Sequence, residues 1–155
     1  MKKTITTITT ITIVLITLSS FRQSNQPNIK VSVQRGEKVY AATCLACHQA
    51  DGDGAPRMNP TLVKTKWVLG NKTALAKIIL NGLKGGELEI DGNNFHNPMP
   101  AQATVLTDLQ IADVLTYVRN SFGNKASAVT PAEVKAARKA AISTTAKPAK
   151  KPTKH

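Results

Sequence analysis

The chain has 155 residues, which is enough for one modest domain with extensions at its ends, and it carries a formal net charge of +12 at pH 7. This charge is uneven, because residues 125–155 contain eight basic residues and one acidic residue, whereas residues 28–124 contain ten basic and eight acidic residues. Nucleic-acid binding needs a basic patch on a folded surface, so the nearly neutral middle of the chain argues against nucleic acid as a partner.

Residues 1–20 have the pattern of a secretory signal peptide. Lys2 and Lys3 precede an uncharged run, and small serine residues suited to cleavage follow it. The run is short for a membrane span. We therefore expect export to the periplasm or another compartment outside the cytoplasm, with an uncleaved membrane anchor as the alternative. Residues 21–31 are polar and are expected to form a linker.

The pattern after the linker predicts a first helix over residues 33–47. Gly36, Tyr40 and Cys44 recur at intervals of four and therefore share one helical face. A glycine inside a helix costs about 1 kcal/mol relative to alanine, and it is tolerated where another backbone must come close. We interpret Gly36 and Tyr40 as residues of helix packing.

The end of this helix carries the motif Cys44-x-x-Cys47-His48, which contains both cysteines of the chain. Its spacing is that of a covalent c-type haem site. Two thiols three residues apart can each reach a vinyl group of one porphyrin, and the adjacent histidine can bind the iron. A disulfide, a thioredoxin-like redox pair and a zinc site completed by His96 are the alternatives. Only 4% of the residues are aromatic, so an attached haem would complete an otherwise small core.

Two further elements are predicted before residue 96. A helix over residues 72–81 is expected between Asn71, which is a good N-cap, and Gly82, which ends it. The dipeptide Asp91-Gly92 predicts a small hairpin within residues 85–95.

The strongest helical pattern of the chain covers residues 108–122. Thr107 is expected to cap this helix, with Gln110 completing a capping box, and Gly123 is expected to end it. A short helix is predicted to begin at Thr130, with Pro131 and Glu133 in its first turn.

Beyond Ile142 the composition is mainly Ala, Thr, Pro and Lys, which predicts disorder. We therefore place the domain at residues 32–124 and a basic tail at residues 125–155. The tail is expected either to be idle or to touch an anionic membrane surface or an acidic partner. Its deletion is expected to leave the haem spectrum unchanged.

Four motifs between residues 35 and 124 have the spacing of a known family. They are Gly36-x-x-x-Tyr40-x-x-x-Cys44-x-x-Cys47-His48, Pro60-x-Leu62, Asn97-Pro98-Met99-Pro100 and Val114-x-x-Tyr117. Together they resemble the class I monohaem cytochrome c family. This resemblance implies an all-α fold in which three to four helices wrap around one covalent haem, with a minor hairpin. The segments Trp67-Val68-Leu69-Gly70 and Gly82-Leu83-x-Gly85 look similar to bacterial domains that serve or fuse to quinoprotein dehydrogenases.

The resemblance also implies the parts of a haem site. Cys44 and Cys47 would attach the haem, and His48 and Met99 would bind its iron. The carbonyl group of Pro60 would accept the second N–H of the His48 ring and fix its orientation.

Other residues compete for these roles. His96 and Met58 are the rivals of Met99 for the sixth position on iron, and a histidine there would give a lower reduction potential. Two prolines flank Met99 and stiffen its backbone, which favours Met99. Trp67 is expected either to donate a hydrogen bond to a haem propionate or to fill the core.

These features predict a monomeric one-electron carrier that is not an enzyme. Its partners would be redox proteins, either a dehydrogenase or a terminal oxidase, and membrane contact is possible through the N-terminus or the basic tail. A haem protein with an open sixth site, such as a small peroxidase or a gas sensor, is the main alternative. A dedicated electron-transfer subunit of a dehydrogenase or oxidase complex is another.

Overall fold

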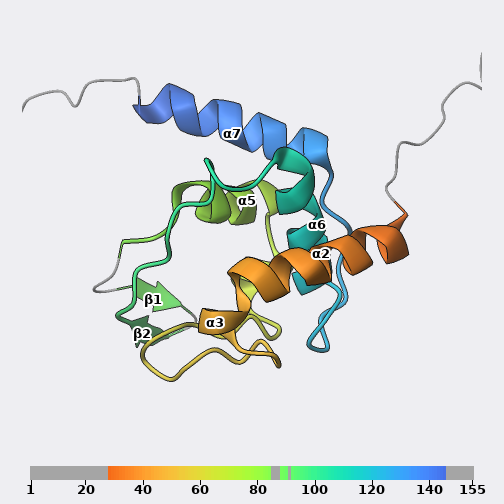
Figure 1. Cartoon of the computed structure of the whole chain (residues 1–155). Helices are drawn as coiled ribbons and strands as arrows, with labels where there is room; N and C mark the ends of the chain where they lie inside the picture. Colours follow the sequence, from red (N-terminus) through yellow and green to blue (C-terminus); the bar gives the residue numbers. More distant parts are fainter. Residues whose placement is uncertain (1–27, 85–87, 91, 146–155) are drawn as a thin grey trace, which may run out of the picture.

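A computed structural model describes residues 28–84, 88–90 and 92–145, so the predicted signal peptide lies outside the described residues. The described residues form six helices and one two-stranded antiparallel hairpin (Figure 1). In chain order they are α2 (Ile29–Thr43), α3 (Leu45–His48), α4 (Lys66–Leu69), α5 (Lys72–Asn81), β1 (Leu88–Ile90), β2 (Asn93–Phe95), α6 (Asp108–Val118) and α7 (Pro131–Thr145). Among them, no helix has both the length and the hydropathy that a bilayer crossing requires. The expected all-α fold with a minor hairpin is confirmed.

Helices α2 and α6 cross at the centre of the molecule (Figure 1). Gly36 lies at the crossing, where a Cβ atom would be 2.0 Å from the carbonyl oxygen of Asp113 and 2.7 Å from Cβ of Tyr117. The expectation that Gly36 permits a close backbone approach is therefore confirmed. The crossing fixes the direction in which α2 delivers Cys44 and the short helix α3.

The predicted bounds of the first helix are wrong at both ends. Helix α2 begins at Ile29, inside the expected linker, because Asn28 caps it by accepting a hydrogen bond from Lys30 N at 3.1 Å. It ends at Thr43, and the haem motif continues in the separate helix α3. Cys44 lies between the two helices with φ −115°, which differs from the φ value of a regular helix. This geometry interrupts the series of helical backbone hydrogen bonds.

Helix α5 and the hairpin agree with the sequence predictions. Asn71 caps α5 through a hydrogen bond from Ala74 N at 3.0 Å, and Gly82 ends it with φ +67°. The strands pair Leu88 with Phe95 at one end of the ladder, and the turn contains Gly92 with φ +82°.

Helix α6 ends at Val118, four residues earlier than predicted, although its capping box of Thr107 and Gln110 is confirmed. The side chain of Asn124 donates a hydrogen bond of 2.7 Å to the carbonyl oxygen of Val118. This amide satisfies a carbonyl group that a further helical turn would otherwise have used. The chain then turns through Phe122, which has φ +57°.

Helix α7 overturns the boundary expected at residue 124. It begins at Pro131 as predicted, but it runs to Thr145 and is a long helix. Val134 and Ala137 are fully buried in the same core cluster as Leu80 of α5 and Ile111 of α6. Figure 1 shows α7 lying across α5 and α6. The packed domain therefore includes α7, while residues 146–155 of the expected tail lie outside the described residues.

Candidate haem site

The Cys44-x-x-Cys47-His48 motif occupies one tight turn. Both cysteines are free thiols, which excludes the disulfide alternative for this structure. The His48 ring places Nδ1 3.0 Å from the carbonyl oxygen of Pro60. A carbonyl oxygen can only accept, so Nδ1 carries the proton and the lone pair of Nε2 is left for a metal ion. The expected contact between His48 and Pro60 is thus present.

Burial controls the protonation of the motif. It lowers the pKa of the His48 imidazole, and the hydrogen bond to Pro60 offsets part of this effect. The ring is neutral at neutral pH, which is the state that binds iron. Burial also raises the pKa of the Cys44 thiol, so this side chain is protonated in the absence of a reaction partner. Cys47 is exposed at the mouth of the site.

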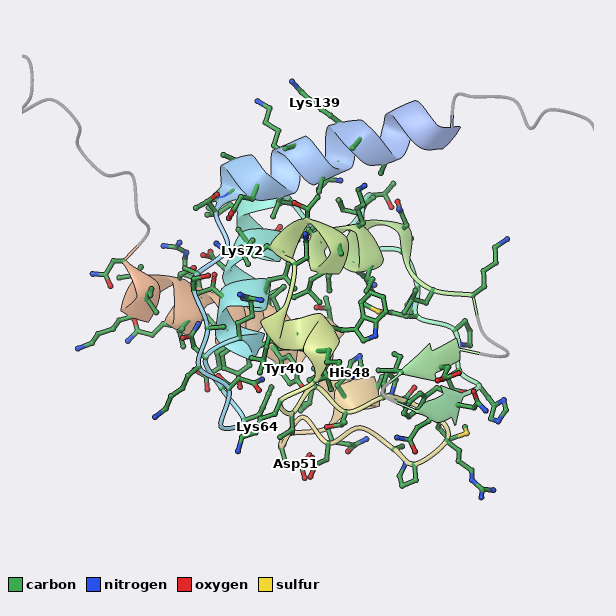
Figure 2. The ribbon with its side chains drawn as sticks, turned by 180° about the vertical axis from the view of Figure 1, so that it is seen from behind. Tyr40, His48, Asp51, Lys64, Lys72 and Lys139 are labelled. Atoms are coloured by element: carbon green, nitrogen blue, oxygen red, sulfur yellow. The ribbon has the colours of Figure 1, made fainter. Side chains whose placement is uncertain are left out.

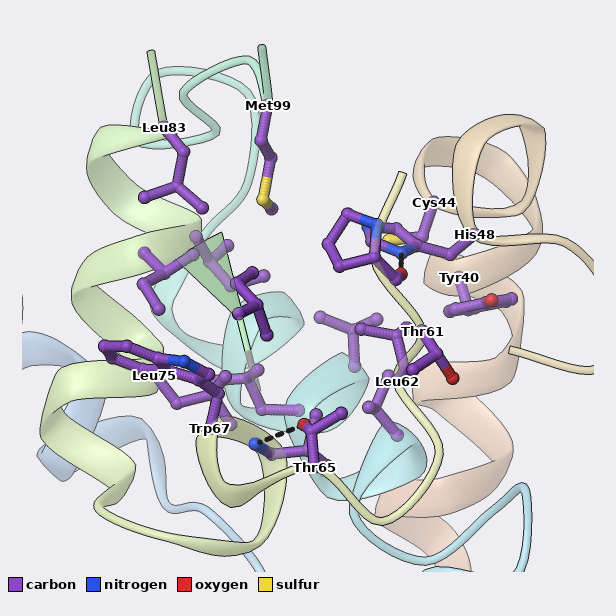
Figure 3. Close-up of a pocket in the computed structure, with 18 residues that line it drawn as sticks. Tyr40, Cys44, His48, Thr61, Leu62, Thr65, Trp67, Leu75, Leu83 and Met99 are labelled. Atoms are coloured by element: carbon purple, nitrogen blue, oxygen red, sulfur yellow. Dashed lines mark hydrogen bonds between the residues drawn. The ribbon is translucent and has the colours of Figure 1, made fainter. Parts of the chain in front are cut away.

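An apolar cavity separates His48 from Met99. Figure 3 shows the Met99 thioether on the side of α5 and the His48 ring on the side of α2 and α3. Both residues, together with Cys44, line this cavity and a second one that adjoins it. The other walls are largely aliphatic and come from α5, the residues just after it, α6 and the chain before α4: Leu62, Leu75, Ile78, Ile79, Leu83, Val114, Leu115 and Val118.

Met99 is held at its backbone rather than by its side chain. Its N–H donates to the carbonyl oxygen of Leu83, and the N–H of Leu83 donates to the carbonyl oxygen of Met99, both at 2.9 Å. Gly82 packs so closely that a Cβ atom there would lie 2.3 Å from the Met99 carbonyl oxygen. The end of α5 therefore fixes the position from which the thioether enters the cavity.

The two rivals of Met99 lie elsewhere. His96 is exposed and lines a separate polar groove beside β2 that His48 does not line. Met58 is 48% exposed and lines neither of the two cavities. Among the described residues there is also no cluster of three His, Cys, Asp or Glu side chains that could hold a metal ion, which argues against the zinc alternative.

Trp67 lies on the cavity wall and is 45% exposed, so it is not part of the protein's own core. Helix α4 positions it, and Thr65 caps that helix by accepting a hydrogen bond from Val68 N at 3.2 Å. Figure 3 shows Trp67 near Leu75, away from Met99. A role toward a propionate stays a prediction.

Tyr40 holds the backbone that directly follows the Cys44-x-x-Cys47-His48 motif. Its hydroxyl donates to the carbonyl oxygen of Gln49 at 2.7 Å, and its ring packs against Tyr117 and Phe122. Burial raises the pKa of Tyr40, so the phenol stays neutral. Figure 2 shows Tyr40 and His48 in the same region of the molecule. The structural interpretation of Tyr40 is confirmed.

The sequence analysis missed a link between the two sides of the site. The side chain of Asn97 donates to Asn59 Oδ1 at 3.1 Å, and the N–H of Asn97 donates to the carbonyl oxygen of Met58 at 3.2 Å. These contacts join the loop before Pro60 to the loop of Met99. Asn59 and Asn97 are 38 positions apart, and no local sequence pattern predicts such a contact.

The donor set fits a haem. Two free thiols, a neutral imidazole with one free nitrogen and a thioether surround an aliphatic cavity, and these are the groups that attach and ligate a c-type haem. A family model described as cytochrome c matches residues 33–122. The chain belongs to the cytochrome c family.

This cytochrome is similar to several characterised proteins. It is 37% identical over 112 residues to the gluconate 2-dehydrogenase cytochrome c subunit of Pantoea cypripedii, which covers 68% of this chain and 24% of that subunit. It is 37% identical to the cytochrome c subunit of the quinone-dependent alcohol dehydrogenase of Gluconacetobacter polyoxogenes, over 64% of this chain and 21% of that subunit. It is 32% identical to cytochrome c6 of Gracilaria tenuistipitata var. liui, over 67% of this chain and 86% of that protein.

The cytochrome thus spans about a quarter or less of the length of the dehydrogenase subunits but most of cytochrome c6. The resemblance to dehydrogenase-associated domains is confirmed. Haem c with its iron is the cofactor that this family carries, as expected from the motif.

Proposed function

We propose that this cytochrome is a one-electron carrier in which His48 and Met99 would bind the haem iron. The observation that carries the proposal is the placement of these two side chains on opposite sides of one apolar cavity. Bound haem supplies an iron that gains or loses a single electron, and a thioether ligand favours its ferrous state.

The protein's own residues would hold this centre rigid. Pro60 orients the His48 ring through Nδ1, which fixes the direction of the free Nε2 lone pair. The paired hydrogen bonds between Leu83 and Met99 hold the opposite ligand at its backbone. The aliphatic walls of the cavity would keep water away from a bound haem. A site that changes little between oxidation states exchanges electrons without large reorganisation.

Binding of the iron by both His48 and Met99 would also argue against an enzyme. A substrate or gas cannot reach the iron unless Met99 leaves, so a peroxidase or gas sensor would need a sixth position that opens. The backbone clamp on Met99 opposes this opening. Electron exchange at an exposed haem edge needs only a small and short-lived interface with the partner.

The partner is proposed to be a dehydrogenase or an oxidase outside the cytoplasm. The names of two relatives describe subunits of gluconate and alcohol dehydrogenases, which favours a dehydrogenase as the electron donor. The proposed periplasmic location rests on the predicted signal peptide and on the family. A monomer with possible membrane contact through its N-terminus or basic tail remains our expectation.

The test is the optical spectrum of the purified holoprotein in both oxidation states. Ferric iron bound to a thioether gives a weak far-red band, which we expect in the parent and in His96→Ala but not in Met99→Ala. A high-spin parent that binds carbon monoxide rapidly when reduced would contradict the carrier function and favour the peroxidase or sensor.

A further inference from the structure

A single side chain of α7 contacts three groups of the segment that follows Met99. The guanidinium of Arg138 donates to the carbonyl oxygens of Ala103 at 2.5 Å and Leu106 at 3.0 Å. It also forms an ion pair with Asp108, with Nε 2.7 Å from Oδ1. All three partners lie between Met99 and the first turn of α6. The arginine therefore ties this whole connection to α7.

Among the described residues, one backbone hydrogen bond joins this connection to α5. The N–H of Gln102 donates to the carbonyl oxygen of Ile79 at 2.9 Å, and the N–H of Leu106 closes a turn onto the Gln102 carbonyl oxygen. Ala103 is four residues from Met99, so the Cα atoms of the two residues can be at most about 14 Å apart. Fixing Ala103 and Leu106 therefore limits how far Met99 can withdraw from the cavity.

We propose that Arg138 is a positioning residue for Met99, acting through the segment 102–108 that its guanidinium holds. This inference rests on the proposed function, in which Met99 is an iron ligand. Met99 would then be held from both sides, by Leu83 at the end of α5 and by Arg138 on α7. The family model matches residues 33–122, so Arg138 lies in the chain that follows the matched region, whereas its three partners lie within it.

Arginine is suited to this role because its planar guanidinium presents several donors in a fixed arrangement. A lysine ammonium also has three donors, but it is a compact charge without the fixed planar arrangement that reaches separated acceptors. The Arg138 side chain is only 24% exposed and Asp108 is 28% exposed, so their contact is partly shielded from water and salt. Hydrogen bonds from a charged donor are stronger than neutral ones.

Other contacts keep α7 in place without Arg138. Val134 and Ala137 are fully buried in the core, and Lys72 Nζ lies 3.1 Å from Glu133 Oε1. Figure 2 shows Lys72 at the start of α5, beneath α7. Loss of the arginine should therefore loosen the segment after Met99 while α7 remains docked. This separates a positioning role from a general role in stability.

The experiment titrates the full-length ferric holoprotein with imidazole, which must displace Met99 to bind iron. We compare the parent with Arg138→Ala, Arg138→Lys and the matched control Lys135→Ala, which removes a charge from an exposed position on the same helix. The apparent affinity for imidazole rises when the displaced state becomes easier to reach. We expect an increase of about tenfold for Arg138→Ala, a smaller one for Arg138→Lys and none for Lys135→Ala.

Hydrogen exchange gives a second readout that does not involve the iron. The amides of Gln102 and Leu106 should exchange about tenfold faster in Arg138→Ala than in Lys135→Ala, while the amides of α7 keep their protection. If Arg138→Ala fails to fold, Arg138→Lys carries the same comparison.

The outcomes separate the two proposals. A parent that lacks the far-red thioether band would overturn the Met99 assignment, and the role of Arg138 with it. A parent that has the band, with imidazole affinity and amide exchange equal in the Arg138 variants and Lys135→Ala, would overturn only the role of Arg138.

Discussion

The space that a side chain at Gly36 would need is already taken by the main chain of Asp113. A Cβ atom at residue 36 would lie 2.0 Å from the Asp113 carbonyl oxygen and 2.5 Å from its carbonyl carbon. Both are backbone atoms in the middle of a helix and cannot rotate away. The crossing of α2 and α6 therefore depends on the absence of this one side chain.

We expect Gly36→Ala to destabilise the protein although alanine is the better helix former. Alanine gains about 1 kcal/mol of helix propensity, but forced separation of the helices costs about 1–3 kcal/mol or more. Because the contacts are so close, we expect the upper end of that cost and thus a net loss of about 1–2 kcal/mol or a failure to fold, measured by urea unfolding of the holoprotein. Gln34→Ala, on the exposed face of α2, should change the free energy of unfolding by less than about 0.5 kcal/mol. A Gly36→Ala variant as stable as the parent would contradict the crossing.

Arg35 and Asp113 form an ion pair at the same crossing. Removing one of these charges should change the free energy of unfolding more than removing the other. Asp113 is 3% exposed and accepts hydrogen bonds from Ser32 and from the Arg35 guanidinium, which contacts it at 2.6 and 2.8 Å. The bond to Asp113 raises the pKa of Arg35. The Arg35 side chain is 46% exposed and can return to water, whereas the carboxylate cannot.

We therefore expect Arg35→Ala to destabilise the protein more than Asp113→Asn does. The first variant leaves a buried carboxylate whose remaining partner among the described residues is Ser32, at a cost of about 2–3 kcal/mol. The second keeps an acceptor for Ser32 and should cost about 1 kcal/mol. The double variant should lose less than the sum of the two. Equal losses, measured in one urea series, would show that water reaches Asp113.

Features with short-range causes could be predicted from the sequence. The caps at Asn71 and Thr107 use side chains that bond three residues ahead, and the turn at Gly92 depends on one positive φ value. The haem motif is similarly local, because its chemistry lies within five consecutive residues. The role of Met99 as an iron ligand was predicted from the family resemblance. The structure places Met99 in the same cavity as His48.

Features that depend on distant partners could not be predicted. The full length and the burial of α7 are not visible in the sequence, because most of its apolar residues are alanines, which indicate a buried face only weakly. Its packing partners Leu80 and Ile111 belong to helices far back in the chain. Likewise, Arg138 reaches partners 30 to 35 residues away. The residues at its start predicted a helix, but only the fold shows which core residues the helix covers.

Truncation tests the revised boundary of the domain. Deleting residues 125–155 removes α7 and exposes the core cluster that Val134 and Ala137 cover, so we expect a loss of about 3–5 kcal/mol in the free energy of unfolding. Deleting residues 146–155 leaves the described contacts of α7 in place and should have little effect. Both variants are compared by urea unfolding and by the far-red band. Equal stability of the two truncated proteins would restore the boundary at residue 124.

Glu133 in the first turn of α7 should make the free energy of unfolding depend on pH in the acidic range. Burial alone would raise the pKa of Glu133, but hydrogen bonds from Thr130 and from Lys72 outweigh it, and the pKa in the folded state is lowered. Folding thus favours the ionised form of Glu133. Its contribution to the free energy of unfolding is fully present above the unfolded-state pKa of about 4.3, and it is lost as the pH falls through the lower folded-state pKa. Glu133→Gln keeps a side chain that can accept at the cap but removes its charge. We expect it to lower stability at pH 7 and to flatten the decline between about pH 5 and pH 3, measured by urea unfolding at each pH. Glu37→Gln, at an exposed position of α2, should retain the parent's decline. If both variants follow the parent's curve, Glu133 does not bind α7 to α5 through its charge.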